Sequence, residues 1–255
     1  MNEMLIRENV AEGMTQLTLN RAPVNALNPE LLAEIEAQLI DIDGDKDIRA
    51  LIITSGLSVF SAGMDLKEAQ KFSIDEQTAI VDALNSSFMQ LYGMSKPVIV
   101  AINGAAIAGG LFFVLASDYT VAREGAKFGL TEVRVGVRFP VVAIEMARAA
   151  LSPIVFRRLL LSGRNVDTDT AKAMGVIDEI VSAGKLKSRA LAVAQDYASI
   201  PPVAYAGVKA QMRAEALGNM KNAISDKTDP TRLGWFSDET RTAMEELLVA
   251  ATSKN

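Results

Sequence analysis

The feature that most constrains this chain is an uncharged, largely apolar stretch over residues 97–117. Its length is that of a membrane-spanning helix, but Asn103-Gly104 and Gly109-Gly110 interrupt it. Its first part, 98–102, is rich in β-branched residues and favours a buried strand, whereas its second part favours a core helix. We therefore expect a strand, a glycine turn and a helix in place of a membrane span.

The turn before that helix has a chemical consequence. The first N–H groups of a helix have no partner within it, and they point outward with the positive end of the helix dipole behind them. A second glycine turn lies at 59–66, also after an apolar strand pattern. Two such turns suggest two backbone N–H donors that converge on one oxygen as an oxyanion hole. The alternative is that the glycines only close tight turns.

The composition narrows the chemistry. The chain has 255 residues, a net charge of -5 and a pI near 5.0, which argues against general nucleic-acid binding. It contains no cysteine, which excludes disulfides, zinc-thiolate sites and cysteine nucleophiles. It also lacks histidine, the usual general base and metal ligand, so proton transfer at neutral pH falls to a carboxylate whose pKa the fold has raised. The N-terminus has no apolar run of signal length, so we expect a cytoplasmic protein.

Repeated strand, turn and helix patterns predict an α/β fold. Residues 4–9 and 14–20 are expected to pair as strands, and Asn28 is expected to cap a helix that starts at Pro29. A loop is expected from Lys127 onward. From about residue 185 the pattern is wholly helical. We therefore predict an α/β core over 1–195 and a helical C-terminal region over 196–255.

Two stretches together resemble the signatures of the crotonase superfamily, the enoyl-CoA hydratases and isomerases. They are 59–66, Val-Phe-Ser-Ala-Gly-Met-Asp-Leu, and 102–110, Ile-Asn-Gly-Ala-Ala-Ile-Ala-Gly-Gly, and the similarity extends over nearly the whole chain. The resemblance implies a spiral of β-β-α turns whose helical C-terminal region builds a homotrimer, often paired into a hexamer. It also implies an acyl-CoA thioester whose carbonyl oxygen lies between the N–H groups of Met64 and Gly109. Coenzyme A is then part of the substrate, with no further cofactor and no metal.

The informative departure from the family pattern is Phe112. The resemblance places one of the two catalytic glutamates of the hydratases there, whereas the second matches Glu132. Hydration by two carboxylates is then in doubt, but moving a double bond needs one base and an oxyanion hole. The pattern is also similar to that of the monofunctional Δ3-Δ2-enoyl-CoA isomerases. We predict an isomerase that converts 3-enoyl-CoA to trans-2-enoyl-CoA with Glu132 as acid and base. An enoyl-CoA hydratase and a non-catalytic acyl-CoA-binding protein are the alternatives.

The remaining site residues each have a second interpretation. The alternative role for Glu132 is a solvated loop carboxylate, or a carboxylate paired with Arg138 that lowers its pKa. Asp65, like Asp118, is also explained as a helix cap or a structural hydrogen-bonding group. Lys67 approaches the CoA phosphates or is an ordinary surface lysine. Phe112 lines the cavity or is core. The substrate-binding set is Ala62, Asp65, Lys67, Gly110, Phe112 and Phe236, the last either at the acyl or CoA pocket across a subunit contact or an anchor within the C-terminal region.

Overall fold

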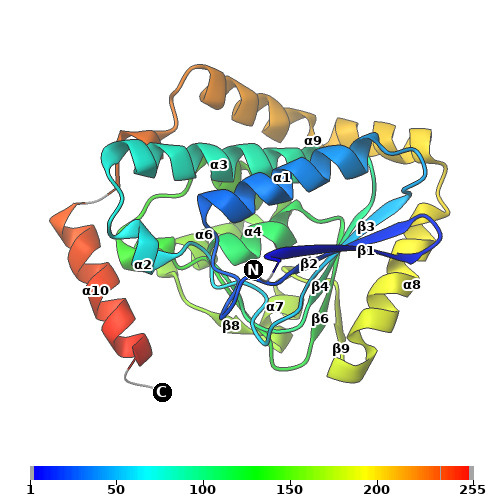
Figure 1. Ribbon diagram of the computed structural model, residues 1–255, viewed down its shortest axis with the longest axis horizontal. Helices are drawn as coiled ribbons and strands as arrows, with labels where there is room; N and C mark the ends of the chain where they lie inside the picture. Colours follow the sequence, from blue (N-terminus) through cyan, green and yellow to red (C-terminus); the bar gives the residue numbers. More distant parts are fainter. Residues whose placement is uncertain (1–2, 236, 253–255) are drawn as a thin grey trace.

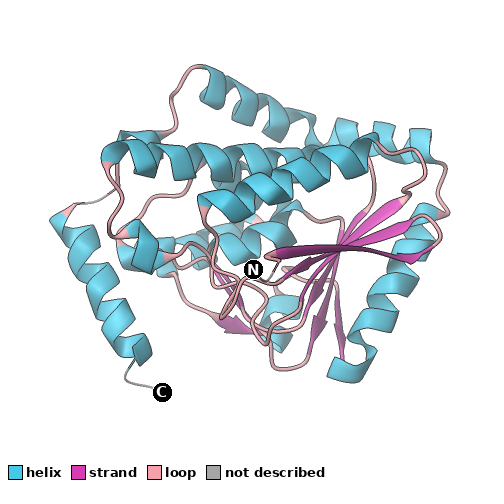
Figure 2. Cartoon of the chain, in the orientation of Figure 1, coloured by secondary structure: helices cyan, strands magenta, loops and turns pink. Residues whose placement is uncertain are grey.

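The computed structural model describes residues 3–235 and 237–252, and it contains a central sheet covered by helices (Figures 1 and 2). The strand order of the larger sheet is β1-β2-β3-β4-β6-β9. The first two strands form the predicted antiparallel pair, and the later neighbours are parallel. Its strands are β1 (Leu5–Ala11), β2 (Met14–Leu19), β3 (Ala50–Ser55), β4 (Val98–Ile102), β6 (Tyr119–Arg123) and β9 (Glu179–Val181).

Both faces of this sheet are buried. Successive residues of a strand point to opposite faces, so neighbouring residues enter different apolar clusters. In β3, Leu51 and Ile53 face the larger core beneath α1 (Pro29–Gly44) and α3 (Ile74–Gly93), whereas Ile52 faces a second apolar cluster beneath α8 (Leu186–Ala198). Figure 1 shows α1 and α3 on one side of the sheet and α8 on the other. This double cover explains why the strand is apolar at nearly every position.

The uncharged stretch over 97–117 folds as predicted. It forms β4 and then the helix α4 (Gly109–Ala116), and every residue of both elements is buried; the short strand over Ala106–Ile107 between them was not predicted. Across the described ranges, no helix is both long and apolar enough to span a membrane. The predicted cap of α1 is also confirmed, because the Asn28 side chain accepts the N–H of Leu31 at 3.1 Å.

A smaller sheet of β5 (Ala106–Ile107), β7 (Lys127–Gly129) and β8 (Val166–Asp167) lies next to the glycine turn. The prediction of a loop from Lys127 was therefore wrong at its start, because Phe128 and Gly129 pair with Ala106 and Ile107. A ladder of two residues is too short for a periodic apolar pattern. The 3-10 helix η1 (Glu132–Val135) follows directly.

The C-terminal region is helical. The division predicted after residue 195 falls inside α8, which packs on the sheet, and the division itself stays a prediction. The other helices are α2 (Leu66–Ala69), α5 (Val141–Ala150), α6 (Pro153–Ser162), α7 (Thr168–Ala173), η2 (Ala183–Lys185), α9 (Pro202–Ser225), η3 (Pro230–Leu233) and α10 (Asp238–Thr252).

Candidate active site

A cavity of about 750 Å³ lies where the two glycine turns, α3, α4, η1 and the C-terminal segment meet. Its size is that of a small-molecule site. Most of its lining is apolar, and its polar groups come mainly from η1 and the neighbouring loops. The residues used below are Ala62, Met64, Ile80, Val81, Leu84, Gly109, Phe112, Glu132, Arg134, Arg138, Arg164, Thr231 and Trp235.

Gly63 and Ala108 bring the two glycine turns into contact. A β-carbon added to Gly63 would lie 2.7 Å from the β-carbon of Ala108 and 3.1 Å from the backbone nitrogen of Gly109. Gly63 has φ +83°, and Ala108 has φ 51° although it carries a side chain. Strained backbone of this kind persists only where the surroundings hold it in place. Met64 follows Gly63 and Gly109 follows Ala108, so the contact also brings Met64 and Gly109 close together.

The amides of Met64 and Gly109 are the two candidate donors. Gly109 is the first residue of α4, so its N–H has no partner within that helix. Within residues 3–235, neither N–H donates to the backbone of another loop or cap. The loops are held in register by two bonds, from Ser61 N–H to Ala105 O and from Ile107 N–H to Ser61 O, each 3.0 Å. Two amides on touching loops, one with a helix dipole behind it, can stabilise an oxyanion.

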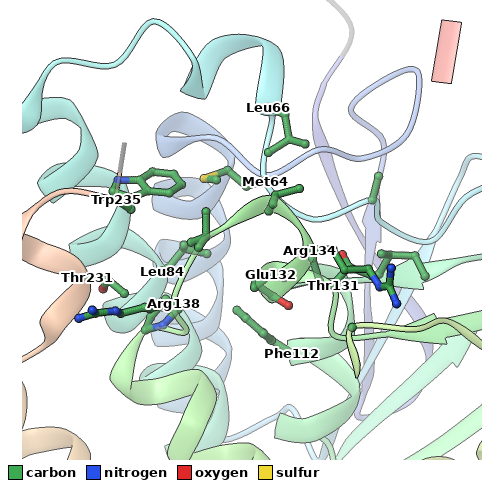
Figure 3. A pocket seen from close by; sticks show the side chains of 18 of the residues that line it. Met64, Leu66, Leu84, Phe112, Thr131, Glu132, Arg134, Arg138, Thr231 and Trp235 are labelled. Atoms are coloured by element: carbon green, nitrogen blue, oxygen red, sulfur yellow. The ribbon is translucent and has the colours of Figure 1, made fainter. Parts of the chain in front are cut away.

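Glu132 begins η1 and lines the cavity (Figure 3). It is 8% exposed, and its Oε2 atom has no hydrogen-bond partner among the residues that the structure describes. The interpretation of Glu132 as a solvated loop carboxylate was therefore wrong. Burial raises the pKa of this carboxyl to about 8. A carboxyl in that state can take up and release a proton near neutral pH.

The alternative in which Arg138 pairs with Glu132 is also wrong. Both Arg134 and Arg138 are exposed, and Figure 3 shows Arg138 extending toward Thr231 while Arg134 lies on the other side of the cavity. Gly136 causes this divergence, because its left-handed conformation, φ 69° and ψ 19°, turns the chain between Glu132 and Arg138. The carboxyl therefore keeps a raised pKa instead of a lowered one.

Phe112 lies beside Glu132 in the cavity wall (Figure 3). It is 3% exposed, and its ring packs edge-to-face on Phe88 with centroids 5.4 Å apart. Both interpretations from the sequence hold, since Phe112 is core and also lines the cavity. Among the described residues that line the cavity, Glu132 is the one carboxylate.

The other predicted site residues lie in different places. Ala62 lines the cavity, but Asp65 caps α2 by accepting the N–H groups of Lys67 and Glu68. Lys67 is exposed on α2, outside the cavity lining. Gly110 packs against Ser61, where a β-carbon would lie 2.4 Å from the carbonyl oxygen. Phe236 is outside the described residues.

Asp65 and Asp118 both have structural partners. The Asp65 carboxylate pairs with Arg21 at 2.9 Å. The Asp118 carboxylate accepts the N–H of Val98 and pairs with Lys209 at 2.6 Å and Arg213 at 2.7 Å. These contacts agree with the structural interpretation of the two residues.

Sequence reasoning missed the part of the cavity wall that α3 and the C-terminal segment supply. Trp235 and Thr231 line it from the C-terminal segment, and Ile80, Val81 and Leu84 line it from α3. An apolar stripe on a helix predicts core packing and gives no sign of a cavity. Trp235 is the single tryptophan of the chain, but nothing in the sequence places it near Glu132.

Comparisons with known proteins agree with this geometry. The sequence model of the family "Enoyl-CoA hydratase/isomerase" matches residues 9–233. "Probable enoyl-CoA hydratase EchA17" of Mycobacterium tuberculosis is 31% identical over 198 residues, which are 78% of this chain and 76% of that protein. "Carnitinyl-CoA dehydratase" of Citrobacter koseri is 30% identical over 200 residues, covering 78% of this chain and 76% of that protein.

The fold is also that of solved members of this family. The crystal structure of human mitochondrial Δ3-Δ2-enoyl-CoA isomerase superposes with a TM-score of 0.94 and 25% sequence identity, covering 99% of this chain and 100% of that one. A family model that spans most of the sequence and a structural match over its full length lead to the same assignment. The crotonase fold predicted from the two signature stretches is thereby confirmed, and the chain belongs to the enoyl-CoA hydratase/isomerase family.

Proposed function

We propose that this protein is an acyl-CoA double-bond isomerase that converts 3-enoyl-CoA to trans-2-enoyl-CoA. The observation that carries the proposal is the single carboxylate among the described cavity residues, Glu132, with Phe112 beside it. Isomerisation needs one group that removes a proton and returns it. A buried carboxyl with a pKa of about 8 suits both steps near neutral pH.

The proposed reaction conserves every atom of the substrate. The Glu132 carboxylate removes a proton from C2 of the 3-enoyl thioester, and the electron pair moves onto the carbonyl oxygen to give a dienolate. The protonated Glu132 then returns its proton to C4, and the double bond forms between C2 and C3. Because the base faces an apolar cavity that holds few competing acids, the proton stays with the substrate.

The oxyanion hole stabilises the dienolate in this proposal. The carbonyl oxygen of the thioester accepts the N–H groups of Met64 and Gly109, and α4 adds the positive end of its dipole. Donors of this kind stabilise the charge that develops in the transition state, and losing one costs about 10²–10³-fold in kcat. The cavity wall formed by Ile80, Val81, Leu84 and Trp235 is apolar and suits the acyl chain.

Hydration is the second candidate, because the relatives at 30–31% identity include a protein named as an enoyl-CoA hydratase. Glu132 alone would then activate the water, since Phe112 offers no second carboxylate. The third candidate, a non-catalytic acyl-CoA-binding protein, is disfavoured. It predicts a Glu132 that is ion-paired and shut away from the cavity, whereas Glu132 lines the cavity and burial alone raises its pKa.

We also propose that the protein forms a homotrimer or a dimer of trimers through its C-terminal region. Val208 and Met212, one turn apart on the same face of α9, are 55% and 79% exposed in the isolated chain, as expected for a face that a second copy covers. Light scattering in solution tests this state. A cytoplasmic location, and a reaction without a cofactor besides the coenzyme A of the substrate, remain parts of the proposal.

The deciding experiment measures turnover of a 3-enoyl-CoA and a 2-enoyl-CoA by the wild type and Glu132→Gln. Fast conversion of the 3-enoyl ester with negligible hydration of the 2-enoyl ester supports the isomerase. Efficient hydration would favour the second candidate. Binding of a saturated acyl-CoA by Glu132→Gln is the control, since retained binding with lost turnover separates catalysis from binding.

A further inference from the structure

The segment that carries Glu132 ends in a tight turn at Gly136. The Gly136 N–H reaches the carbonyl of Val133 at 3.3 Å, and the Val137 N–H donates to the carbonyl of Glu132 at 3.0 Å. Gly136 adopts the left-handed conformation that glycine tolerates best. The backbone of Glu132 is therefore held directly by this turn, and whatever moves Gly136 also moves the proposed base.

Helix α10 is attached to this turn. Thr240, in the first turn of α10, is 1% exposed, and its hydroxyl donates to the carbonyl oxygen of Gly136 at 3.1 Å. Ser237 fixes that hydroxyl through an O···O contact of 3.0 Å. A β-carbon on Gly136 would lie 3.0 Å from Thr240 Oγ1 and 3.1 Å from Thr240 Cα, so the two backbones pack closely.

Helix α10 is attached to the rest of the protein mainly through η1. In the described part of the chain, α10 makes its main contacts with η1, and Figure 1 shows α10 at the edge of the molecule, separated from the sheet. Thr240 and Met244 are its buried residues in the first two turns, while Glu239, Arg241 and Glu245 are exposed. The contact between Thr240 and Gly136 therefore couples the position of α10 to that of η1.

We propose that Thr240 is a positioning residue for the proposed reaction, in which α10 holds η1 so that Glu132 stays buried against the cavity. The inference rests on the proposed function for its catalytic meaning. Thr240 itself lies outside the cavity lining, so it acts through Gly136 and not through the substrate.

The pKa of Glu132 is raised by burial and not by a neighbouring charged group. The elements around η1 offer apolar groups from α3 and α4. The charged side chains near η1 are exposed, and three of them, Arg134, Arg138 and Arg164, also line the cavity, but none of them shifts the pKa of Glu132. These exposed groups are Arg134 and Arg138 on the segment itself, Arg157 and Arg158 on α6, Arg164 after α6, and Asp238, Glu239, Arg241, Glu245 and Glu246 on α10. If η1 loosens, water reaches Glu132 and its pKa falls toward the ordinary value of 4.5.

The matched test compares Thr240→Val, which keeps the shape and removes the hydroxyl, with Thr240→Ser, which keeps the hydroxyl. The dependence of kcat/KM on pH is measured for both on a 3-enoyl-CoA, with circular dichroism as the check on folding. We expect the midpoint of the acid limb to fall by about one pH unit or more in Thr240→Val, with a drop in kcat on the order of tenfold, and wild-type behaviour in Thr240→Ser. An unchanged midpoint in a folded Thr240→Val would overturn the inference. Thr240→Ala takes its place if Thr240→Val does not fold.

A second readout does not depend on turnover. The unfolding free energy is measured against pH for chains with Glu132 and with Glu132→Gln, each in the wild-type and Thr240→Val backgrounds. We expect the pH-dependent difference between Glu132 and its glutamine variant to shrink in the Thr240→Val background. If the wild type does not isomerise but this difference still shrinks, the proposed function fails and the positioning role stands. If the difference is unchanged, the positioning role fails whatever the reaction is.

Discussion

Gly63 and Ala108 touch across the two loops that carry the amides of Met64 and Gly109. The distance of 2.7 Å from a β-carbon at Gly63 to that of Ala108 is shorter than real side chains tolerate. The close approach of the two loops therefore depends on the missing side chain at Gly63. This contact offers a way to alter the proposed oxyanion hole without touching the proposed base.

Gly63→Ala is expected to lower kcat on 3-enoyl-CoA by about 10²–10³-fold, because the added methyl group separates the two amides. Gly175→Ala is the matched control. Gly175 also has a positive φ, +72°, but a β-carbon there has nothing within 4 Å. Both variants carry the same kind of backbone strain, which costs about 1 kcal/mol. Steady-state kinetics and thermal unfolding of Gly63→Ala and Gly175→Ala separate the effect of backbone strain on stability from the effect of the displaced amides on kcat. Equal kcat values for the two variants would contradict the role of the loop contact.

Glu132→Gln is expected to remove a pH dependence of stability. The folded carboxyl has a pKa of about 8 against 4.5 ordinarily, so the folded chain binds a proton that the unfolded chain has released. The unfolding free energy therefore falls as pH rises from about 4.5 through about 8, by roughly 2–3 kcal/mol between pH 6 and 9. Urea unfolding of both proteins checks this. Burial also lowers the pKa of Lys209 to about 8, so this lysine titrates in the same pH range. Both proteins contain Lys209, so the difference between their unfolding free energies removes its contribution.

Phe112→Glu places a second carboxyl beside Glu132. We expect a destabilisation of about 3 kcal/mol or more, because the site is 3% exposed and lies against Phe88. In the folded fraction we expect the rate of hydration of a 2-enoyl-CoA to rise about tenfold or more above that of the wild type. One carboxyl can then activate the water while the other protonates the substrate. The control is Phe112→Gln, whose new side chain has nearly the same shape as that of Phe112→Glu but no ionisable group. A rise of equal size in Phe112→Gln would contradict the role of the carboxyl.

Asp118→Asn is expected to cost stability but not chemistry. The carboxylate pairs with the buried Lys209 and with the largely buried Arg213, and its loss leaves both cations with backbone carbonyl partners in place of a carboxylate, at a cost of about 3–5 kcal/mol. Turnover per folded molecule should stay at the wild-type value because Asp118 lies outside the cavity lining. Chemical denaturation and kinetics measure the two quantities. Asp196→Asn, at an exposed position of α8, should change stability by less than about 0.5 kcal/mol.

Local sequence predicted the larger elements because each carries its own signal. The β-branched run at β4 and the Asn28-Pro29 cap of α1 depend on neighbours a few residues away. The pairing of β5 with β7 was not predictable in this way. It joins two residues to two others about twenty positions later, and the turns around it set the geometry.

The environment of Glu132 was the least predictable part of the site. A glutamate in a loop is exposed in most proteins, and its burial here depends on α3, α4 and α10, which are distant in sequence. The alternative in which Arg138 pairs with Glu132 could not be rejected from the sequence, because it is the turn at Gly136 that sends the arginine away. The composition called for a carboxylate and the family resemblance named Glu132, but only packing across the chain set the pKa of that carboxyl.

The cover of the sheet by α8 has a consequence for biosynthesis. Ile52 and Ile99 lie on the face that α8 closes, and α8 is made more than eighty residues after β4. A nascent chain that has released β3 and β4 from the ribosome therefore presents an open apolar face until residue 198 has emerged. Contacts this distant along the chain form slowly, and exposed apolar strands are prone to associate. We expect the growing chain to need chaperone protection during that interval, which the finished protein no longer needs.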